Sequence, residues 1–146
     1  MRLIGVLLCG AFVLACSKQW PSPTQDTTPY TLEYGALPEP EIPLDNPLTV
    51  QGVKLGRMLF YEPRLSADGS MSCASCHRQQ NAFSDTAQFS IGIHGLPGKR
   101  QAMSAVNMLW NSNGYFWDGR AEKLREQILM HIAAGLDLYV SLVYVF

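Results

Sequence analysis

The feature that most constrains this chain is the five-residue segment Cys73–His77, which reads CASCH. Two thiols three positions apart can each add to a vinyl group of the same haem. The histidine that follows is then placed under the iron as its proximal ligand. This spacing is typical of covalent haem attachment. We therefore expect Cys73 and Cys76 to carry one haem c and His77 to ligate its iron.

Two other kinds of site could use the same cysteines, namely a structural zinc site and a redox-active dithiol. A zinc site needs four Cys or His ligands, usually as two pairs, and the remaining cysteines, Cys9 and Cys16, lie in a segment typical of an export signal. A thioredoxin-like dithiol follows a strand in a βαβ pattern, and the sequence shows no such pattern. The sequence favours haem over both alternatives without excluding them.

The first 16 residues predict export from the cytoplasm. Arg2 precedes an apolar run that is shorter than the ~20 residues needed to span a bilayer, so a secretory signal is favoured over a membrane helix. Residues 13–16, VLAC, resemble the bacterial lipobox, and Ser17 is similar to the pattern for outer-membrane sorting. We expect a lipid on Cys16 that anchors the chain in the membrane, facing the periplasm. The alternative is an ordinary signal peptide with a chance cysteine.

Residues 17–47 predict a semi-extended tether between the lipid and a folded domain. This stretch holds seven of the nine prolines in the chain, and proline neither donates a backbone hydrogen bond nor continues a helix. Tyr30, Leu32 and Tyr34 could pack part of it on the domain. The formal net charge of the whole chain is −1, so no basic surface indicates a nucleic-acid partner.

Residues 48–135 predict one all-helical domain with long loops, because apolar residues recur at helical spacing and no alternation is long enough for a sheet. We expect a first helix to start at Asn46-Pro47 and to run to Phe60. The further expected elements are a short helical turn at the CASCH segment, a loop over residues 78–100, a helix over 102–110, and a helix from 119 or 120 to 132 capped by Asp118.

The last nine residues, 138–146, are uncharged and rich in aromatic and β-branched side chains, and with residues 136 and 137 they make up a C-terminal tail, 136–146. Nine such residues cannot span a bilayer as a helix, and an exposed segment of this kind favours aggregation. We therefore expect these residues to be the product of truncation or a frame shift.

With these motifs in view, the chain resembles the N-terminal half of the bacterial di-haem cytochrome c peroxidases. The resemblance covers residues 48 to about 132, and its order and spacing are more specific than the haem motif alone. The matching segments are LGRMLF at 55–60, Leu65-Ser66, SCASCH at 72–77, AFSD at 82–85, Arg100, Asn107, FWDGRA at 116–121, Leu124 and Gln127. The resemblance implies a cytochrome c-like haem domain that reduces hydrogen peroxide to water with electrons from a cytochrome or other donor.

The resemblance also implies roles for single residues. Trp117 matches the tryptophan between the two haems and would be an electron bridge, although it could equally be a core aromatic. Gln127 matches a glutamine near the peroxide site. In the same register, Asp137 falls where the family has a catalytic glutamate and could move a proton between the peroxide oxygens. Gln101 stands where the family commonly has a calcium-binding asparagine, so this metal is not predicted.

His94 lies in a loop where some family members have a histidine that fills the sixth iron position in the resting enzyme. We expect it either to be this distal ligand or to be an exposed loop histidine. The 146 residues contain no second CxxCH motif, so the electron-receiving haem of the family is not encoded in them. Three interpretations therefore stay open: a peroxidase that is possibly incomplete, a monohaem periplasmic electron-transfer cytochrome, and a fragment that does not fold.

Overall fold

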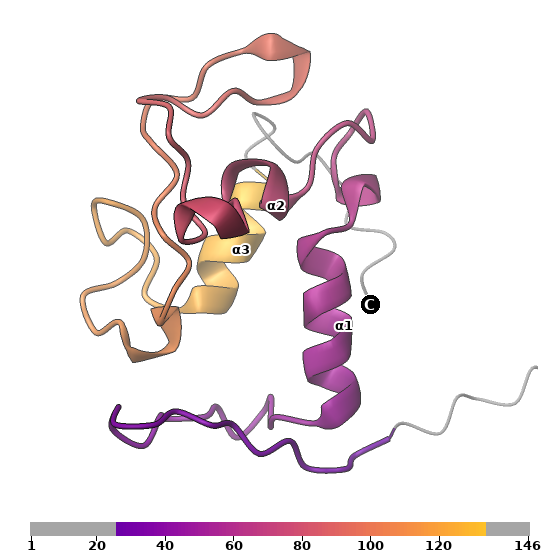
Figure 1. The fold of residues 1–146 in the computed structure, drawn as a ribbon, viewed down its shortest axis with the longest axis vertical. Coiled ribbons are helices and arrows are strands. Elements are labelled where there is room, and N and C mark those ends of the chain that lie inside the picture. Colours follow the sequence, from indigo (N-terminus) through magenta and orange to yellow (C-terminus); the bar gives the residue numbers. More distant parts are fainter. Residues whose placement is uncertain (1–25, 134–146) are drawn as a thin grey trace, which may run out of the picture.

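A computed structural model describes residues 26–133, which form three α-helices joined by long loops (Figure 1). The helices are α1 (Val50–Phe60), α2 (Cys73–Cys76) and α3 (Leu124–Ala133). Short 3-10 helices lie between them: η1 (Pro63–Leu65), η2 (Gln79–Asn81), η3 (Ile93–Gly95) and η4 (Met108–Trp110). Residues 26–133 contain isolated β-bridges but no strand. The expected all-helical class is therefore confirmed for this part of the chain.

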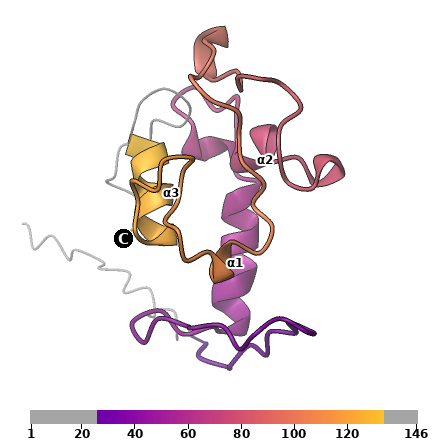
Figure 2. The ribbon, with the colours of Figure 1, turned by 90° about the vertical axis from the view of Figure 1, so that its left-hand side faces the viewer.

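The CASCH segment forms helix α2 and ends with His77 as the residue that closes this helix. The short helix α2 lies near the C-terminal end of α1, and residues 26–49 cross the opposite end of α1 (Figures 1 and 2). We call residues 26–49 the N-terminal strap. No helix within residues 26–133 is long and apolar enough to cross a membrane. The signal at 1–16 and the tail at 136–146 lie outside the described residues.

The first helix begins later than Asn46-Pro47, so that prediction of its start was wrong. Thr49 is the N-cap, with extended backbone and a hydroxyl that accepts a hydrogen bond from the Gly52 amide at 3.0 Å. The residue before it, Leu48, accepts a hydrogen bond from the Tyr30 amide at 3.0 Å. Pairing with residues 28–30 keeps residues 48 and 49 extended, and the helix can start only after them.

The helix expected over 102–110 is also wrong, since only η4 is helical there. The Ala102 amide donates to the Ser90 hydroxyl at 3.2 Å, and the Ala105 amide donates to the Phe83 carbonyl at 3.1 Å. The Ser84 hydroxyl in turn donates to the Ala102 carbonyl at 3.0 Å. Backbone groups that bond to a distant segment cannot form helical bonds, so tertiary contacts override a modest helix propensity.

The third helix starts at Leu124 rather than at residue 119 or 120, and Asp118 does not cap it. The Asp118 carboxylate is instead paired with Arg100 and Arg120, at 2.7 and 2.8 Å. Glu126 caps α3, because its carboxylate accepts from the amides of Glu122 and Lys123 at 3.1 and 3.2 Å. A carboxylate in the first turn also complements the positive end of the helix dipole.

The N-terminal strap is held against residues far away in the sequence. Arg125 of α3 makes two hydrogen bonds of 2.9 Å to the two oxygens of Asp45. The indole nitrogen of Trp110 donates to the Pro38 carbonyl at 2.8 Å. Residues 38–49 therefore follow the domain surface. Within this stretch, the strap contacts the first turn of α3 through Asp45 and the short helix η4 through Pro38.

The helices bury little apolar surface against one another. Among the described residues, the buried apolar side chains are Ile93, Tyr115 and Ala121, and no large side chain is fully buried. Hydrophobic stabilisation grows with the apolar area removed from water, so packing among residues 26–133 contributes little. A domain of this size then depends on an additional constraint, such as a prosthetic group.

We predict that combining Asp45→Asn with Trp110→Phe detaches the strap without unfolding the helices. The double variant loses the charged bidentate pair and the indole hydrogen bond while it keeps the ring at 110. Limited chymotrypsin digestion at Tyr30 and Tyr34 should become faster, while far-ultraviolet circular dichroism stays unchanged. Arg64→Gln is the control, since its ion pair with Glu62 at 2.7 Å is local. Equal cleavage rates in wild type and double variant would contradict the attachment.

Candidate haem-binding site

The two thiols of the CASCH segment lie on one short helix. The Ser72 amide donates to the Ser75 hydroxyl at 3.0 Å, which closes the first turn of α2. Cys73 and Cys76 are half-buried, and neither forms a disulfide. Burial raises the pKa of the Cys73 thiol, so this group is neutral at physiological pH. A reactive dithiol needs a lowered pKa, so the redox-dithiol alternative is disfavoured.

His77 ends α2 with its ring held in a defined orientation. Its backbone amide donates to the Cys73 carbonyl at 2.9 Å, and its Nδ1 lies 3.1 Å from the Phe83 carbonyl oxygen. A carbonyl oxygen only accepts, so Nδ1 carries the proton and Nε2 carries the lone pair. This leaves Nε2 as the nitrogen able to bind a metal, with the carbonyl as the outer partner that orients the ring.

The Phe83 carbonyl is presented by a strained backbone turn. Ala82 and Phe83 both have positive φ, at 53° and 55°, a conformation that is costly for residues other than glycine. The turn is held by the Phe83 amide, which donates to the Arg78 carbonyl at 2.8 Å, and by the Ser104 hydroxyl, which donates to the Ala82 carbonyl at 2.7 Å. The surroundings therefore fix the acceptor that orients His77.

The ring of Phe60 lies beside the imidazole of His77 and packs against the ring of Phe83. The centroid of Phe60, at the end of α1, lies 6.5 Å from that of His77 and 6.0 Å from that of Phe83. The Phe60 and Phe83 rings meet edge to face, an arrangement that aromatic pairs favour. The imidazole thus has an aromatic side chain as a neighbour on α1.

Trp117 lies at the surface, with 60% of its area exposed. Its indole nitrogen donates to the Gln101 carbonyl at 2.9 Å, and the Gln101 side chain donates to the Asp85 carbonyl at 2.7 Å. Through Gln101, the indole is connected to the segment that includes Phe83. The expectation that Trp117 bridges electrons stays a prediction, and its position beside the Phe83 segment is compatible with that role.

The turn that carries Trp117 depends on Gly119 and on a charge cluster. Gly119 has φ of 66°, and a Cβ there would lie 2.9 Å from the Asn113 carbonyl oxygen, so a larger residue does not fit. Hydrogen bonds from Arg100 and then from Arg120 lower the pKa of Asp118 to about 2. The guanidinium of Arg120 also lies 3.5 Å from the ring centroid of Phe116, a cation–π contact.

The structure does not gather the other predicted site residues around His77. His94 is exposed and has φ of 62° within η3. The loop that carries η3 extends away from the helices in Figures 1 and 2. Gln127 is half-buried on α3, and its backbone amide donates to the Lys123 carbonyl at 3.1 Å. Asp137 lies outside the described residues. The roles proposed for these three residues stay predictions.

In the part of the chain that the structure describes, no site could bind a metal ion through protein ligands alone. No group of three or more His, Cys, Asp or Glu residues lies close enough there to hold a metal ion. A zinc site at Cys73 and Cys76 would need ligands from outside residues 26–133. The donor set that is present, two thiols and one imidazole on one helical turn, fits the covalent attachment of haem.

The sequence does not reveal which residues orient the ligand. Phe60 and Phe83 belong to motifs noted above, but no local pattern shows that the Phe60 ring and the Phe83 carbonyl lie beside His77. The pairing of Arg100 with Asp118 was missed for the same reason, since 18 positions separate the two residues. Only the chemical complementarity of their charges could have suggested it.

The sequence profile described as di-haem cytochrome c peroxidase matches residues 50–139. The chain is 39% identical over 100 residues to the methylamine utilization protein MauG of Methylorubrum extorquens. The matched region covers 68% of this chain and 28% of that protein. It is 39% identical over 104 residues to the cytochrome c peroxidase Ccp of Escherichia coli, covering 71% of this chain and 22% of that protein.

A solved structure gives the same result in three dimensions. The crystal structure of a MauG-like protein associated with microbial copper homeostasis matches with a TM-score of 0.60 and 33% sequence identity, over 76% of this chain and 29% of that one. The chain thus spans between about a fifth and a third of the length of these relatives.

We predict that the charge cluster at Asp118 fixes the Trp117 indole. Asp118→Asn should weaken both arginine contacts and alter the indole hydrogen bond to Gln101 at pH 7. In wild type, the lowered pKa keeps the cluster intact as the pH falls below 3.8, the ordinary value for Asp, and the cluster is lost only as the pH approaches 2. Ultraviolet resonance Raman spectra, taken as differences from Trp117→Phe, report this hydrogen bond.

Asp26→Asn is the control for this prediction. Asp26 is exposed and its pKa is also lowered, chiefly by the Thr28 hydroxyl, but it bonds only to Thr28 and Gln51 among the described residues. Its substitution should leave the Trp117 signal unchanged. An unchanged signal in Asp118→Asn at pH 7 would show that the cluster does not position the indole.

Proposed function

The chain belongs to the di-haem cytochrome c peroxidase family, and from this membership we propose that it carries one covalently attached haem c and uses it in the reduction of hydrogen peroxide. The observation that carries the proposal is the placement of Cys73 and Cys76 on one turn of α2, followed by His77 with Nδ1 engaged and Nε2 available. Hydrogen peroxide is the proposed substrate, and a small redox protein such as a cytochrome is the proposed donor.

The residues present fit the haem and divide its binding between them. Cys73 and Cys76 would form the two thioether links, and His77 Nε2 would ligate the iron. Phe60 lies beside the imidazole and packs against Phe83, and the Phe83 carbonyl increases the basicity of the imidazole. When bound, the haem would supply an iron that exchanges electrons, which is the chemistry that reduction of peroxide needs.

The remaining proposed residues serve proton and electron movement. Gln127 would orient the peroxide through its side-chain amide, and Asp137 would hold and deliver the proton that lets water leave. Trp117 would pass electrons between this domain and a neighbouring redox centre. Reduction of one peroxide molecule consumes two electrons and two protons, so the donor must deliver an electron twice per turnover.

The test of this function starts from the chain matured with a c-type haem attachment system. We predict one haem per chain that resists acid–acetone extraction, and Cys73→Ser or Cys76→Ser should shift the pyridine haemochrome band toward that of a single thioether. His77→Gln should alter the ferric spectrum, because it removes the proximal ligand. Haem that extracts fully from wild type would contradict the proposal.

The same sample separates peroxidase chemistry from simple electron transfer. High-spin ferric iron whose optical and paramagnetic resonance spectra change on adding an equimolar amount of hydrogen peroxide supports the peroxidase. Low-spin iron that does not respond to peroxide indicates a six-coordinate electron carrier. In that event His94→Ala would show whether His94 is the blocking ligand, since its loss should restore the high-spin spectrum.

We also propose that the domain is attached to the cell envelope by lipid on Cys16, facing the periplasm and sorted to the outer membrane. The lipobox-like residues 13–16 support this location, together with haem attachment that takes place outside the bacterial cytoplasm. Two or three acyl chains on one residue would suffice for stable membrane association of a domain.

Cys16→Ser tests the anchor in the full chain expressed in a bacterium. We predict that the variant moves from the membrane fraction to the soluble fraction, because acyl chains can no longer be attached. Cys9→Ser is the matched control, since Cys9 precedes the proposed cleavage site and should leave the wild-type distribution unchanged. A wild-type chain found only in the soluble fraction would contradict the lipid anchor.

A further inference from the structure

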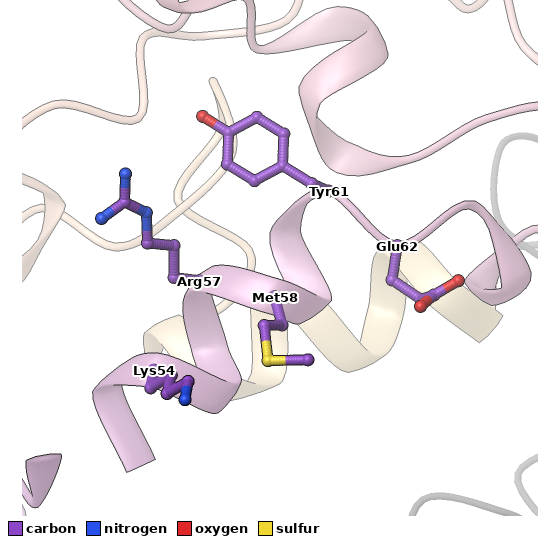
Figure 3. Close-up of a pocket in the computed structure, with 5 residues that line it drawn as sticks. All are labelled: Lys54, Arg57, Met58, Tyr61 and Glu62. Carbon is purple, nitrogen blue, oxygen red and sulfur yellow. The ribbon is translucent and has the colours of Figure 1, made fainter. Parts of the chain in front are cut away.

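Helix α1 presents one continuous stripe of exposed side chains. Lys54, Arg57, Met58 and Tyr61 follow one another at the spacing that places side chains on one side of a helix. Together with Glu62 they line an open depression of about 560 Å³, which we call the α1 hollow (Figure 3). No residue of α1 is buried, and Met58 is 61% exposed. This side of α1 is therefore uncovered in the part of the chain that the structure describes.

The α1 hollow does not belong to the haem site. Met58 and Phe60 are two residues apart, and at about 100° per residue their side chains leave the helix on nearly opposite sides. Phe60 lies 6.5 Å from His77 between ring centroids, so the Phe60 side is the one that faces the proposed ligand. The exposed stripe is thus available for a contact of a different kind.

The charge of the α1 hollow is positive. Helix α1, with the sequence VQGVKLGRMLF, contains Lys54 and Arg57 and no acidic residue. Neither cation forms an ion pair with another residue in the range 26–133. The acidic residue of the hollow, Glu62, is neutralised by Arg64, which makes hydrogen bonds of 2.8 and 2.7 Å to its two oxygens. The surface that fits this hollow is therefore an anionic one.

The chain that leads to Cys16 leaves the described region beside the start of α1. The Val50 amide donates to the Thr28 carbonyl at 2.9 Å, and the Gln51 side chain donates to Asp26 at 3.4 Å. The ten residues from position 16 to position 26 span at most about 35 Å. The hollow begins three residues after Gln51, about 5 Å along the helix axis. A lipid on Cys16 would therefore keep the hollow within reach of the bilayer surface.

These features match the requirements of a contact with a membrane surface. An anionic lipid surface attracts basic side chains, and each one near the surface strengthens association about fivefold. Tyrosine is enriched at membrane interfaces because its ring is apolar and its hydroxyl is polar. Two cations alone bind weakly, but a lipid anchor already confines the domain to the surface, so the contact has only to orient it. Docking of a protein would not require the tether to leave beside the hollow.

We propose that the α1 hollow is a second membrane contact, which holds the anchored domain with α1 against an anionic phospholipid surface. The inference rests on the lipid anchor proposed at Cys16 and adds to it an orientation of the domain. Lys54 and Arg57 would lie at the level of the lipid phosphates, with Met58 between the headgroups. Because Phe60 points to nearly the opposite side of the helix, the proposed haem ligand would face away from the bilayer.

The test measures how fast lysines react in the haem-loaded, lipidated chain bound to vesicles. Acetylation by an N-hydroxysuccinimide ester is followed by mass spectrometry at Lys54 and, as an internal control outside the hollow, at Lys99. Lys54 should react several-fold more slowly on vesicles of phosphatidylethanolamine and phosphatidylglycerol than on vesicles of phosphatidylcholine, while Lys99 reacts equally on both. Added salt should remove the protection, because it screens the charges.

Arg57→Glu tests the charge of the hollow and keeps Lys54 as the reporter. In this variant the ratio of Lys54 reactivity on the two kinds of vesicle should approach one, because the reversed charge is repelled by anionic lipid. Lys99→Glu changes the net charge of the chain equally and should leave Lys54 protected. Unchanged circular dichroism and visible spectra confirm that both variants keep the fold and the haem.

Two results would overturn the inference. One is a Lys54 that reacts equally on both kinds of vesicle in wild type, which would leave the hollow to a protein partner. The other is equal loss of protection in Arg57→Glu and Lys99→Glu, which would show that only net charge matters. Flotation separates these failures from failure of the anchor: if wild type floats with phosphatidylcholine vesicles and Cys16→Ser does not, the anchor stands and only the second contact is wrong.

Discussion

The rest of the site depends on the Phe83 carbonyl oxygen. It lies 3.1 Å from His77 Nδ1 and also accepts the Ala105 amide at 3.1 Å. One acceptor thereby sets the imidazole orientation and fixes residues 102–105 in an extended path. Because two consecutive non-glycine residues with positive φ present it, the acceptor is kept in place by its surroundings and not by local preference.

The same segment links the ligand to Trp117. Asp85, two residues beyond Phe83, accepts the Gln101 side chain, and the Gln101 backbone accepts the indole of Trp117. Next to that indole, Arg100 pairs with Asp118. The consecutive residues 100 and 101 therefore hold the consecutive residues 117 and 118. An exposed aromatic side chain is thus positioned by hydrogen bonds and charge, where a buried one would be positioned by packing.

Two exposed aromatic residues, Tyr61 and Trp117, therefore stand in different relations to His77. Tyr61 is connected through the Phe60 ring and Trp117 through backbone hydrogen bonds. Among the described residues, a region with little buried apolar surface thus combines a fixed ligand orientation with exposed aromatic side chains.

The sequence alone determined what is local in this protein: the thiols and imidazole of Cys73–His77, the helix that ends at Phe60, the all-helical class and the family. Each rests on residues that lie close together in the chain, and their types and spacing indicate which structure or chemistry they support. The start of α1 at Val50, the loss of helix over 102–110 and the pairing of Asp118 with Arg100 were decided by the tertiary structure. In each case a backbone or charged group bonds to a partner at least 18 positions away, and such bonds outweigh the small differences in local propensity from which boundaries are predicted.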